Sequence, residues 1–316
     1  MRRLAIANLV AQIGIMVTGV TVRVTGSGLG CPGWPECFPG SMVPVSNADV
    51  APLHQWVEFG NRLLTFVIVV VAALVLLAAL GTRPRRTRLT RLAAVMPAGI
   101  VAQAVIGGIT VLTDLAWGGV ALHFMVSAGL VWLSAALVLA AGEGDGPGPR
   151  QSSLPRAIRG LVGVSSGVLA ALLVAGTLVT AAGPHAGDAE TPRLGLGVEA
   201  MAQLHAELLF GYLGLLVGLG FALHAVAAPA TVRRRYAVLV AVVVAQGVLG
   251  GVQYALGVPE GLVSLHVLGA ALVTVAAAAV WTGTTTREPV SADHDPAPWT
   301  EPSAAATEQP TLVERA

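Results

Sequence analysis

A six-residue motif occurs twice in this chain, and each copy is followed by a histidine at the same distance. Gln103-Ala-Val-Ile-Gly-Gly108 and Gln246-Gly-Val-Leu-Gly-Gly251 share the pattern Gln-x-x-x-Gly-Gly. His123 and His266 each lie 20 residues after the glutamine, inside an apolar run. The glutamine, the two glycines and the histidine therefore all recur 143 positions later in the chain. Such a repeat indicates a duplicated structural unit. Because ionisable groups are costly inside a membrane, a histidine at the same depth in both copies is typical of a functional position.

The composition indicates a polytopic membrane protein. Hydrophobic residues make up 55% of the chain and charged residues 11%, and the mean hydropathy is +0.76. Apolar runs of about 20 residues are long enough to cross a bilayer as helices, the form in which a lipid-exposed chain pairs its own backbone groups. Eight such runs are predicted, at residues 4–22, 57–80, 92–112, 117–141, 157–181, 200–227, 236–256 and 262–283.

The arginines predict the orientation of the chain. All 18 basic residues are arginine. Most lie at the N-terminus, after the second, fourth and sixth apolar runs, and in the tail. Because cytoplasmic loops carry an excess of basic residues, both termini are predicted to be cytoplasmic. The net charge of +1 gives no reason to expect a nucleic-acid partner.

The predicted fold is all-α, with eight transmembrane helices in two tandem four-helix bundles. Each unit has an even number of helices, so the copies share one orientation and a pseudo-two-fold axis along the membrane normal is expected. We assign residues 1–145 to the first unit and 146–284 to the second. Residues 285–316 are rich in proline, alanine and acidic residues, and they are predicted to form a disordered cytoplasmic tail.

Three histidines are predicted to lie at a similar depth, near the outer ends of their helices. His123, His205 and His266 lie in the fourth, sixth and eighth runs, and Asn61 takes the equivalent place in the second. His205 and His266 are expected on facing helices of the second unit, where neutral imidazoles could bind one heme iron from both sides. The alternative for any single histidine is a hydrogen bond to a neighbouring helix.

The loop after the first run contains Cys31 and Cys37, the two cysteines of the chain. The predicted topology puts this Pro- and Gly-rich loop on the oxidising side, where a disulfide is the simplest interpretation. Metal binding by two cysteines is less favoured, since zinc normally takes four ligands. A redox role for the pair stays open.

The second run begins with a group of polar residues. If the helix starts near Pro52, then His54, Glu58 and Asn61 share one face. One hypothesis assigns Glu58 to proton transfer and Arg62 to an anionic group such as a heme propionate. The alternative is that both charged side chains reach from the membrane rim to water.

These segments together resemble heme A synthase. The resemblance is carried by residues 23–37 (Arg-Val-Thr-Gly-Ser-Gly-Leu-Gly-Cys-Pro-Gly-Trp-Pro-Glu-Cys), residues 58–62 (Glu-Phe-Gly-Asn-Arg), both Gln-x-x-x-Gly-Gly motifs and residues 179–188. It implies oxidation of a methyl group of heme O to the formyl group of heme A. It also implies a heme b held by His205 and His266, a substrate heme near His123, an essential Glu58, and a disulfide between the two cysteines.

One departure from the family pattern concerns the first unit. The family usually has Glu-x-x-His-Arg in the second helix, whereas this chain has Asn61 at the histidine position. Asparagine is a poor iron ligand, so the substrate iron is expected to be held by His123 alone. His54 is the alternative second ligand, although it lies about 10 Å higher along the helix.

The resemblance also implies partners and a location. Heme O is the expected substrate, heme O synthase and a quinol or another electron donor are expected partners, and the bacterial cytoplasmic membrane is the expected location. The sequence leaves the oligomeric state open, together with the roles of His185 and Glu207. The competing hypothesis is a diheme membrane cytochrome that carries electrons without substrate chemistry. A transporter is less favoured, because the paired glycines equally allow close helix packing.

Overall fold

Eight long helices form the part of the chain that the computed structural model describes, which is residues 1–47, 49–143 and 150–287. Each helix is long and apolar enough to cross a membrane. The prediction of an all-α, multi-pass membrane protein is therefore confirmed. The helices are α1 (Arg2–Val24), α2 (Pro52–Leu80), α3 (Thr87–Leu112), α4 (Trp117–Gly142), α5 (Arg156–Ala182), α6 (Val198–Ala225), α7 (Ala230–Ala255) and α8 (Glu260–Gly283).

Prolines mark the starts of several helices. Helix α2 begins at Pro52, ahead of the predicted apolar run 57–80, and Pro155, Pro229 and Pro259 directly precede α5, α7 and α8. Proline suits these positions because the first backbone N–H groups of a helix have no acceptor within the helix. The chain can therefore turn sharply between antiparallel helices that lie side by side.

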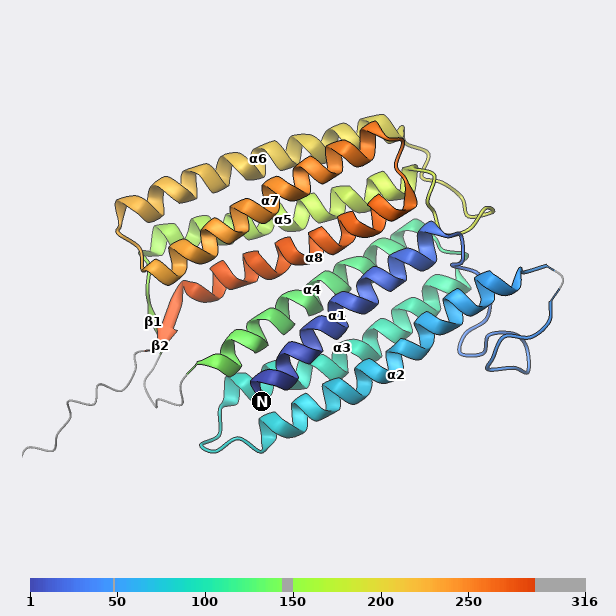
Figure 1. Ribbon diagram of the computed structural model, residues 1–316, viewed down its shortest axis with the longest axis horizontal. Helices are drawn as coiled ribbons and strands as arrows, with labels where there is room; N and C mark the ends of the chain where they lie inside the picture. Colours follow the sequence, from blue (N-terminus) through green and yellow to red (C-terminus); the bar gives the residue numbers. More distant parts are fainter. Residues whose placement is uncertain (48, 144–149, 288–316) are drawn as a thin grey trace, which may run out of the picture.

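The helices lie in two groups, α1–α4 and α5–α8 (Figure 1). In the first group each helix packs against the next, and α4 closes the ring on α1. In the second group α5 packs closely on α6 and α7 on α8, while contacts between these two pairs are sparse. The predicted pseudo-two-fold axis stays a prediction.

Helices α1, α4 and α8 join the two groups. A small apolar core lies between them, formed by Met16 of α1, Ala128 and Val131 of α4, and Ala271 of α8. Helices α4 and α8 are the most buried of the eight, because each packs against both groups. The small side chains at the contact allow these helices to approach closely.

The two ends of the helices differ in their loops. We call the end with loops 25–51, 113–116, 183–197 and 256–259 the disulfide end, and the opposite end the arginine end. At the arginine end, β1 (Arg150–Ser152) pairs antiparallel with β2 (Thr285–Arg287), which ties the start of the second group to its end. The first three residues of the predicted tail thus form a strand, and residues 288–316 lie outside the described part of the chain.

Candidate functional site

His205 of α6 and His266 of α8 face each other inside the second group. Their ring centroids are 6.4 Å apart and their planes are inclined by 61°. Metal–imidazole bonds are about 2.0 Å long, and a ring nitrogen lies about 1.2 Å from its centroid, so two imidazoles on one metal have centroids roughly 6 Å apart. The structure thus brings together the two histidines that the sequence paired, at a separation that fits one metal ion between them.

One nitrogen of His205 is held by a neighbouring helix. Its Nδ1 lies 3.1 Å from the carbonyl oxygen of Leu172 on α5. Because a carbonyl only accepts, Nδ1 carries the hydrogen and Nε2 keeps a free lone pair. The ring also lies close to Gly176, where an added Cβ would come within 3.2 Å of Cε1. A hydrogen bond of this kind orients metal-binding histidines.

His266 is held through its backbone. The side-chain Nε2 of Gln246 on α7 donates to the carbonyl oxygen of His266 over 2.7 Å. One turn further along α7, an added Cβ at Gly250 would lie 3.0 Å from the Cε1 atom of His266. The His266 Nδ1 atom is buried, and it has no hydrogen-bond partner among the described residues.

His123 of the first group has nearly the same surroundings. Gln103 on α3 donates to the carbonyl oxygen of His123 over 3.0 Å, and an added Cβ at Gly107 would lie 3.1 Å from the His123 Cε1. Gln103 also contacts the hydroxyl of Ser127. The Nδ1 atom of His123 is likewise buried and lacks a partner within the described chain.

The two groups differ at the position opposite this histidine. Asn61, the counterpart of His205, accepts a hydrogen bond from the hydroxyl of Thr18 over 2.7 Å. Its side-chain oxygen is therefore engaged with α1. His54 lies two turns earlier on α2, where its Nδ1 is 2.8 Å from the hydroxyl of Ser27. The first group thus presents His123 without an opposed imidazole at the Asn61 position.

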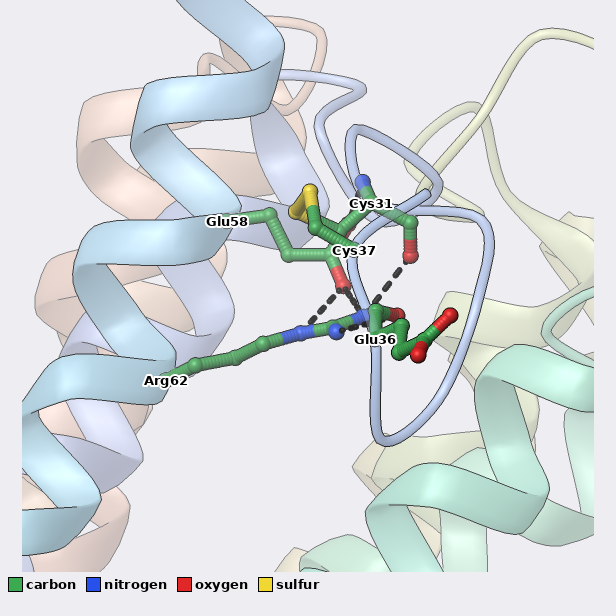
Figure 2. A network of polar contacts seen from close by, with 5 residues as sticks. All are labelled: Cys31, Glu36, Cys37, Glu58 and Arg62. Atoms are coloured by element: carbon green, nitrogen blue, oxygen red, sulfur yellow. Dashed lines mark hydrogen bonds and ion pairs between the residues drawn. A yellow bond between two sulfur atoms is a disulfide. The ribbon is translucent and has the colours of Figure 1, made fainter. Parts of the chain in front are cut away.

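Glu58 and Arg62 hold the disulfide loop against α2 (Figure 2). Cys31 is bonded to Cys37, as the sequence predicted. Glu58 is 5% exposed. One of its oxygens accepts from Arg62 over 2.6 Å and the other from the backbone N–H of Cys31 over 2.6 Å. Arg62 also donates to the carbonyl oxygen of Cys31 over 2.7 Å. Both charged groups predicted for substrate chemistry are thus engaged with the loop.

The same loop reaches the wall of the first group through Trp34. An added Cβ at Gly108 of α3 would overlap the indole ring of Trp34. The two glycines of the first motif therefore pack against different rings: Gly107 against the imidazole of His123 and Gly108 against the indole of Trp34. The second motif differs here, because a Cβ at Gly251 would meet nothing within 4 Å.

Loops from both groups are hydrogen-bonded at the disulfide end. Arg23 of α1 donates to the carbonyl oxygen of His185 over 2.7 Å, and the backbone N–H of Gly28 donates to the carbonyl oxygen of Gly187 over 2.8 Å. The Nε2 of His185 lies 2.9 Å from the carbonyl oxygen of Val258. His185 therefore links the end of α1 in the first group to the loop between α7 and α8 in the second. Glu207, the other residue left open by the sequence, accepts from Gln203 at an exposed position.

Sequence reasoning did not assign the contacts of the motif glutamines, of Trp34 or of Asn61. The motif glutamines were recognised as a repeat marker but were given no role, although their constant spacing to the histidines was a signal. The contact of Trp34 with Gly108 had a weaker signal, a large aromatic residue inside a disulfide loop. The hydrogen bond from Thr18 to Asn61 had no signal in the sequence, because residues 43 positions apart meet only through the packing of their helices.

The residues of the second group fit a heme with two axial histidines. A porphyrin itself supplies four nitrogen ligands to its iron, so two protein ligands complete the set. His205 and His266 are at a suitable separation, and the bond to Leu172 leaves Nε2 of His205 available. The helices that carry them are apolar, as a porphyrin site requires. In the first group, His123 alone offers an equivalent imidazole.

Comparison with known proteins gives a family and two named relatives. The model of a family described as cytochrome oxidase assembly protein (COX15-CtaA) matches residues 2–193. A heme A synthase of Geobacillus thermodenitrificans is 38% identical over 56 residues, which are 18% of this chain and 16% of the relative. A heme A synthase of Geobacillus kaustophilus matches to the same extent. These alignments thus span less than a fifth of either relative.

Proposed function

The chain belongs to the family of cytochrome oxidase assembly proteins, and from this premise we propose that it is a heme A synthase. In this proposal it oxidises the porphyrin methyl group of heme O to a formyl group, a four-electron step that takes an external oxidant such as dioxygen, and it supplies heme A to terminal oxidases. The names of both Geobacillus relatives support the activity. The main structural support for a heme protein is that His205 and His266 face each other with their ring centroids 6.4 Å apart.

The second group would hold a resident heme b. His205 and His266 would bind its iron, with Leu172 fixing the orientation of the His205 ring and Gln246 the backbone of His266. When bound there, a bis-histidine heme supplies electron transfer. The helices that carry the pair are apolar, and a low local polarity would keep the electrostatic interactions at the site strong.

The first group would take heme O as substrate. His123 would bind the substrate iron from one side, because Asn61 is engaged with Thr18 and offers no imidazole. This leaves one face of the substrate open to reaction, in contrast to the second group. Glu58 would serve as the acidic residue of the reaction. Arg62 donates to Glu58, to the Cys31 carbonyl and to the Glu36 carbonyl, and its one remaining N–H would be directed to a propionate.

The proposal extends to location and partners. The excess of arginine in the loops of the arginine end supports its assignment to the cytoplasm, with both termini on that side, and the membrane would be the cytoplasmic membrane of a bacterium. The disulfide end would then face the oxidising compartment, in keeping with the Cys31–Cys37 bond. Heme O synthase would supply the substrate, and a quinol or a similar donor would exchange electrons with heme b.

Analysis of extracted hemes tests the activity. Hemes from cells that make heme O, with and without this protein, are separated by chromatography and identified by mass. We expect a heme with a formyl in place of the methyl group, and we expect Glu58→Gln to abolish it. If heme O stays unchanged while the purified protein shows a bis-histidine heme b spectrum, the protein is a diheme-type electron carrier and the synthase proposal is wrong.

A further inference from the structure

The Gln-x-x-x-Gly segment makes the same pair of contacts in both groups. In each copy the glutamine side chain donates to the backbone carbonyl of the histidine, over 3.0 Å for Gln103 and 2.7 Å for Gln246. In each copy the glycine four residues later adjoins the imidazole of that histidine. Residues i and i+4 lie on one face of a helix, so both contacts come from a single face. The spacing of the motif thus matches two contacts with one residue.

We propose that Gln103 and Gln246 are positioning residues that fix the depth and orientation of His123 and His266 toward a heme. A helix carbonyl already accepts one N–H from the residue four positions later, and its second lone pair is free. The glutamine donates to this side of the carbonyl, which in the first group also accepts from the Ser127 hydroxyl, and so it fixes the backbone of the histidine rather than its ring. The glycine then sets how closely the ring packs. This inference rests on the proposed heme sites of the two groups.

The cost of the arrangement supports a role beyond helix packing. The side-chain oxygens of Gln103 and Gln246 are both buried without a hydrogen-bond partner within the described part of the chain. Burying a polar group without a hydrogen-bond partner destabilises a folded protein, because the group loses its hydrogen bonds to water. An apolar residue at either place would pack the helices without this penalty, yet the same polar residue occupies both.

The second group depends on its glutamine more than the first. In the first group, Ser127 contacts Gln103 and also donates to the His123 carbonyl over 3.0 Å. The place equivalent to Ser127 is Ala270, which has no hydroxyl. Gln246 is therefore the side chain that holds the carbonyl of His266, and its removal should have the larger effect.

The test compares Gln246→Leu with Tyr236→Phe in the purified holoprotein. Tyr236 also lies on α7, and its hydroxyl donates to a helix carbonyl, that of Leu216 on α6, over 2.7 Å. Each substitution therefore removes one bond from α7 to a backbone carbonyl, but only the first removes it at a histidine. The readouts are the low-spin electron paramagnetic resonance signal of heme b, its midpoint potential, and the rate of heme loss in detergent.

We expect Gln246→Leu to change the resonance signal and to accelerate heme loss roughly tenfold, the lower end of what outer-shell partners of metal ligands contribute. Tyr236→Phe should leave both unchanged, because its hydrogen bond lies away from the histidine. Equal effects of the two variants would reduce Gln246 to a packing residue and overturn the inference. If the wild-type protein contains no heme b, the proposed heme site fails instead.

Two further variants sharpen the test. An added Cβ at Gly269 of α8 would overlap the side-chain oxygen of Gln246. Gly269→Ala therefore displaces the glutamine from outside the motif, and we expect the same spectral change as for Gln246→Leu. Gln103→Leu should leave the heme b signal unchanged, because Gln103 acts in the first group. A heme b change in Gln103→Leu, or none in Gly269→Ala, would contradict the assignment.

Discussion

Glu58 and Arg62, one turn apart on α2, together bind the backbone N–H and the carbonyl of Cys31. The carboxylate accepts from the N–H over 2.6 Å, the guanidinium donates to the carbonyl over 2.7 Å, and the two side chains form an ion pair at 2.6 Å. Both peptide groups flanking one half of the disulfide are thus fixed to a transmembrane helix. The position of the loop depends on this pair as well as on the disulfide.

Glu58→Gln is expected to loosen this attachment. The substitution keeps the size of the side chain but removes the charge that Arg62 faces inside a buried site. Losing hydrogen bonds to a charged group costs roughly 1.5–3 kcal/mol, so the free energy of unfolding should fall by about that amount. Thermal unfolding in detergent measures it. Glu36→Gln is the control, because within the described residues the Glu36 side chain accepts a hydrogen bond only from the exposed Gly40 N–H.

Activity separates the two roles of Glu58. If Glu58 only holds the loop, heme A formation by Glu58→Gln should fall in proportion to the folded fraction. If Glu58 is also the acidic residue of the reaction, activity should be lost even where the protein is fully folded. We expect the second result. Activity that follows folding would remove Glu58 from the catalytic residues.

Replacement of both cysteines by serine should destabilise the disulfide end. The bond joins residues six positions apart, and closing so short a loop contributes about 2–3 kcal/mol by chain entropy. We expect dithiothreitol to lower the unfolding temperature of the wild-type protein to that of Cys31→Ser combined with Cys37→Ser. The double variant should not respond to dithiothreitol. A response of the variant would show that the reductant acts elsewhere.

His54 and His123 are expected to differ sharply when replaced. His123→Ala removes the one imidazole that the first group presents at heme depth, so heme A formation should be abolished while heme b stays bound. His54→Ala removes a bond to Ser27 in the loop, which costs about 1 kcal/mol of stability. Retained activity in His123→Ala would overturn the substrate site. Complete loss in a folded His54→Ala would restore His54 as a candidate second ligand.

The two adjacent glycines of the second motif provide a matched pair. Gly250→Ala adds a Cβ at 3.0 Å from the His266 Cε1, whereas Gly251→Ala adds one that meets nothing within 4 Å. Both substitutions raise helix propensity equally. We expect Gly250→Ala to weaken heme b retention several-fold and Gly251→Ala to leave it unchanged, as measured by heme content after gel filtration. Equal heme content would show that the ring can shift without cost.

The helices and the motifs were predictable because each rests on local sequence. Membrane helices follow from long apolar runs, and the repeat follows from an offset that needs no structure. The start of α2 at Pro52 follows from proline geometry. The disulfide follows from two cysteines in a short loop on one side of the membrane.

The contacts between helices were not predictable in the same way. Whether Glu58 meets substrate or the N–H of Cys31 depends on how the loop folds back onto α2, and no local pattern encodes that. The bond from Thr18 to Asn61 depends on the rotation of two helices about their axes. The strand at Thr285–Arg287 arises because the end of α8 lies beside the start of the second group, whereas composition alone predicted disorder there.

The packing of Trp34 against Gly108 predicts that the disulfide loop and α3 respond to each other. Trp34 lies between the two cysteines of the loop, and Gly108 adjoins Gly107, the residue next to the His123 ring. Gly108→Ala would push the indole away, because its Cβ overlaps the ring. We therefore expect dithiothreitol to reduce the Cys31–Cys37 bond several-fold faster in Gly108→Ala than in the wild-type protein, measured by thiol labelling over time. Gly251→Ala, at the open position of the other group, should reduce at the wild-type rate. An unchanged rate in Gly108→Ala would mean that Glu58 and Arg62 alone hold the loop, and that Trp34 follows the loop without stabilising it.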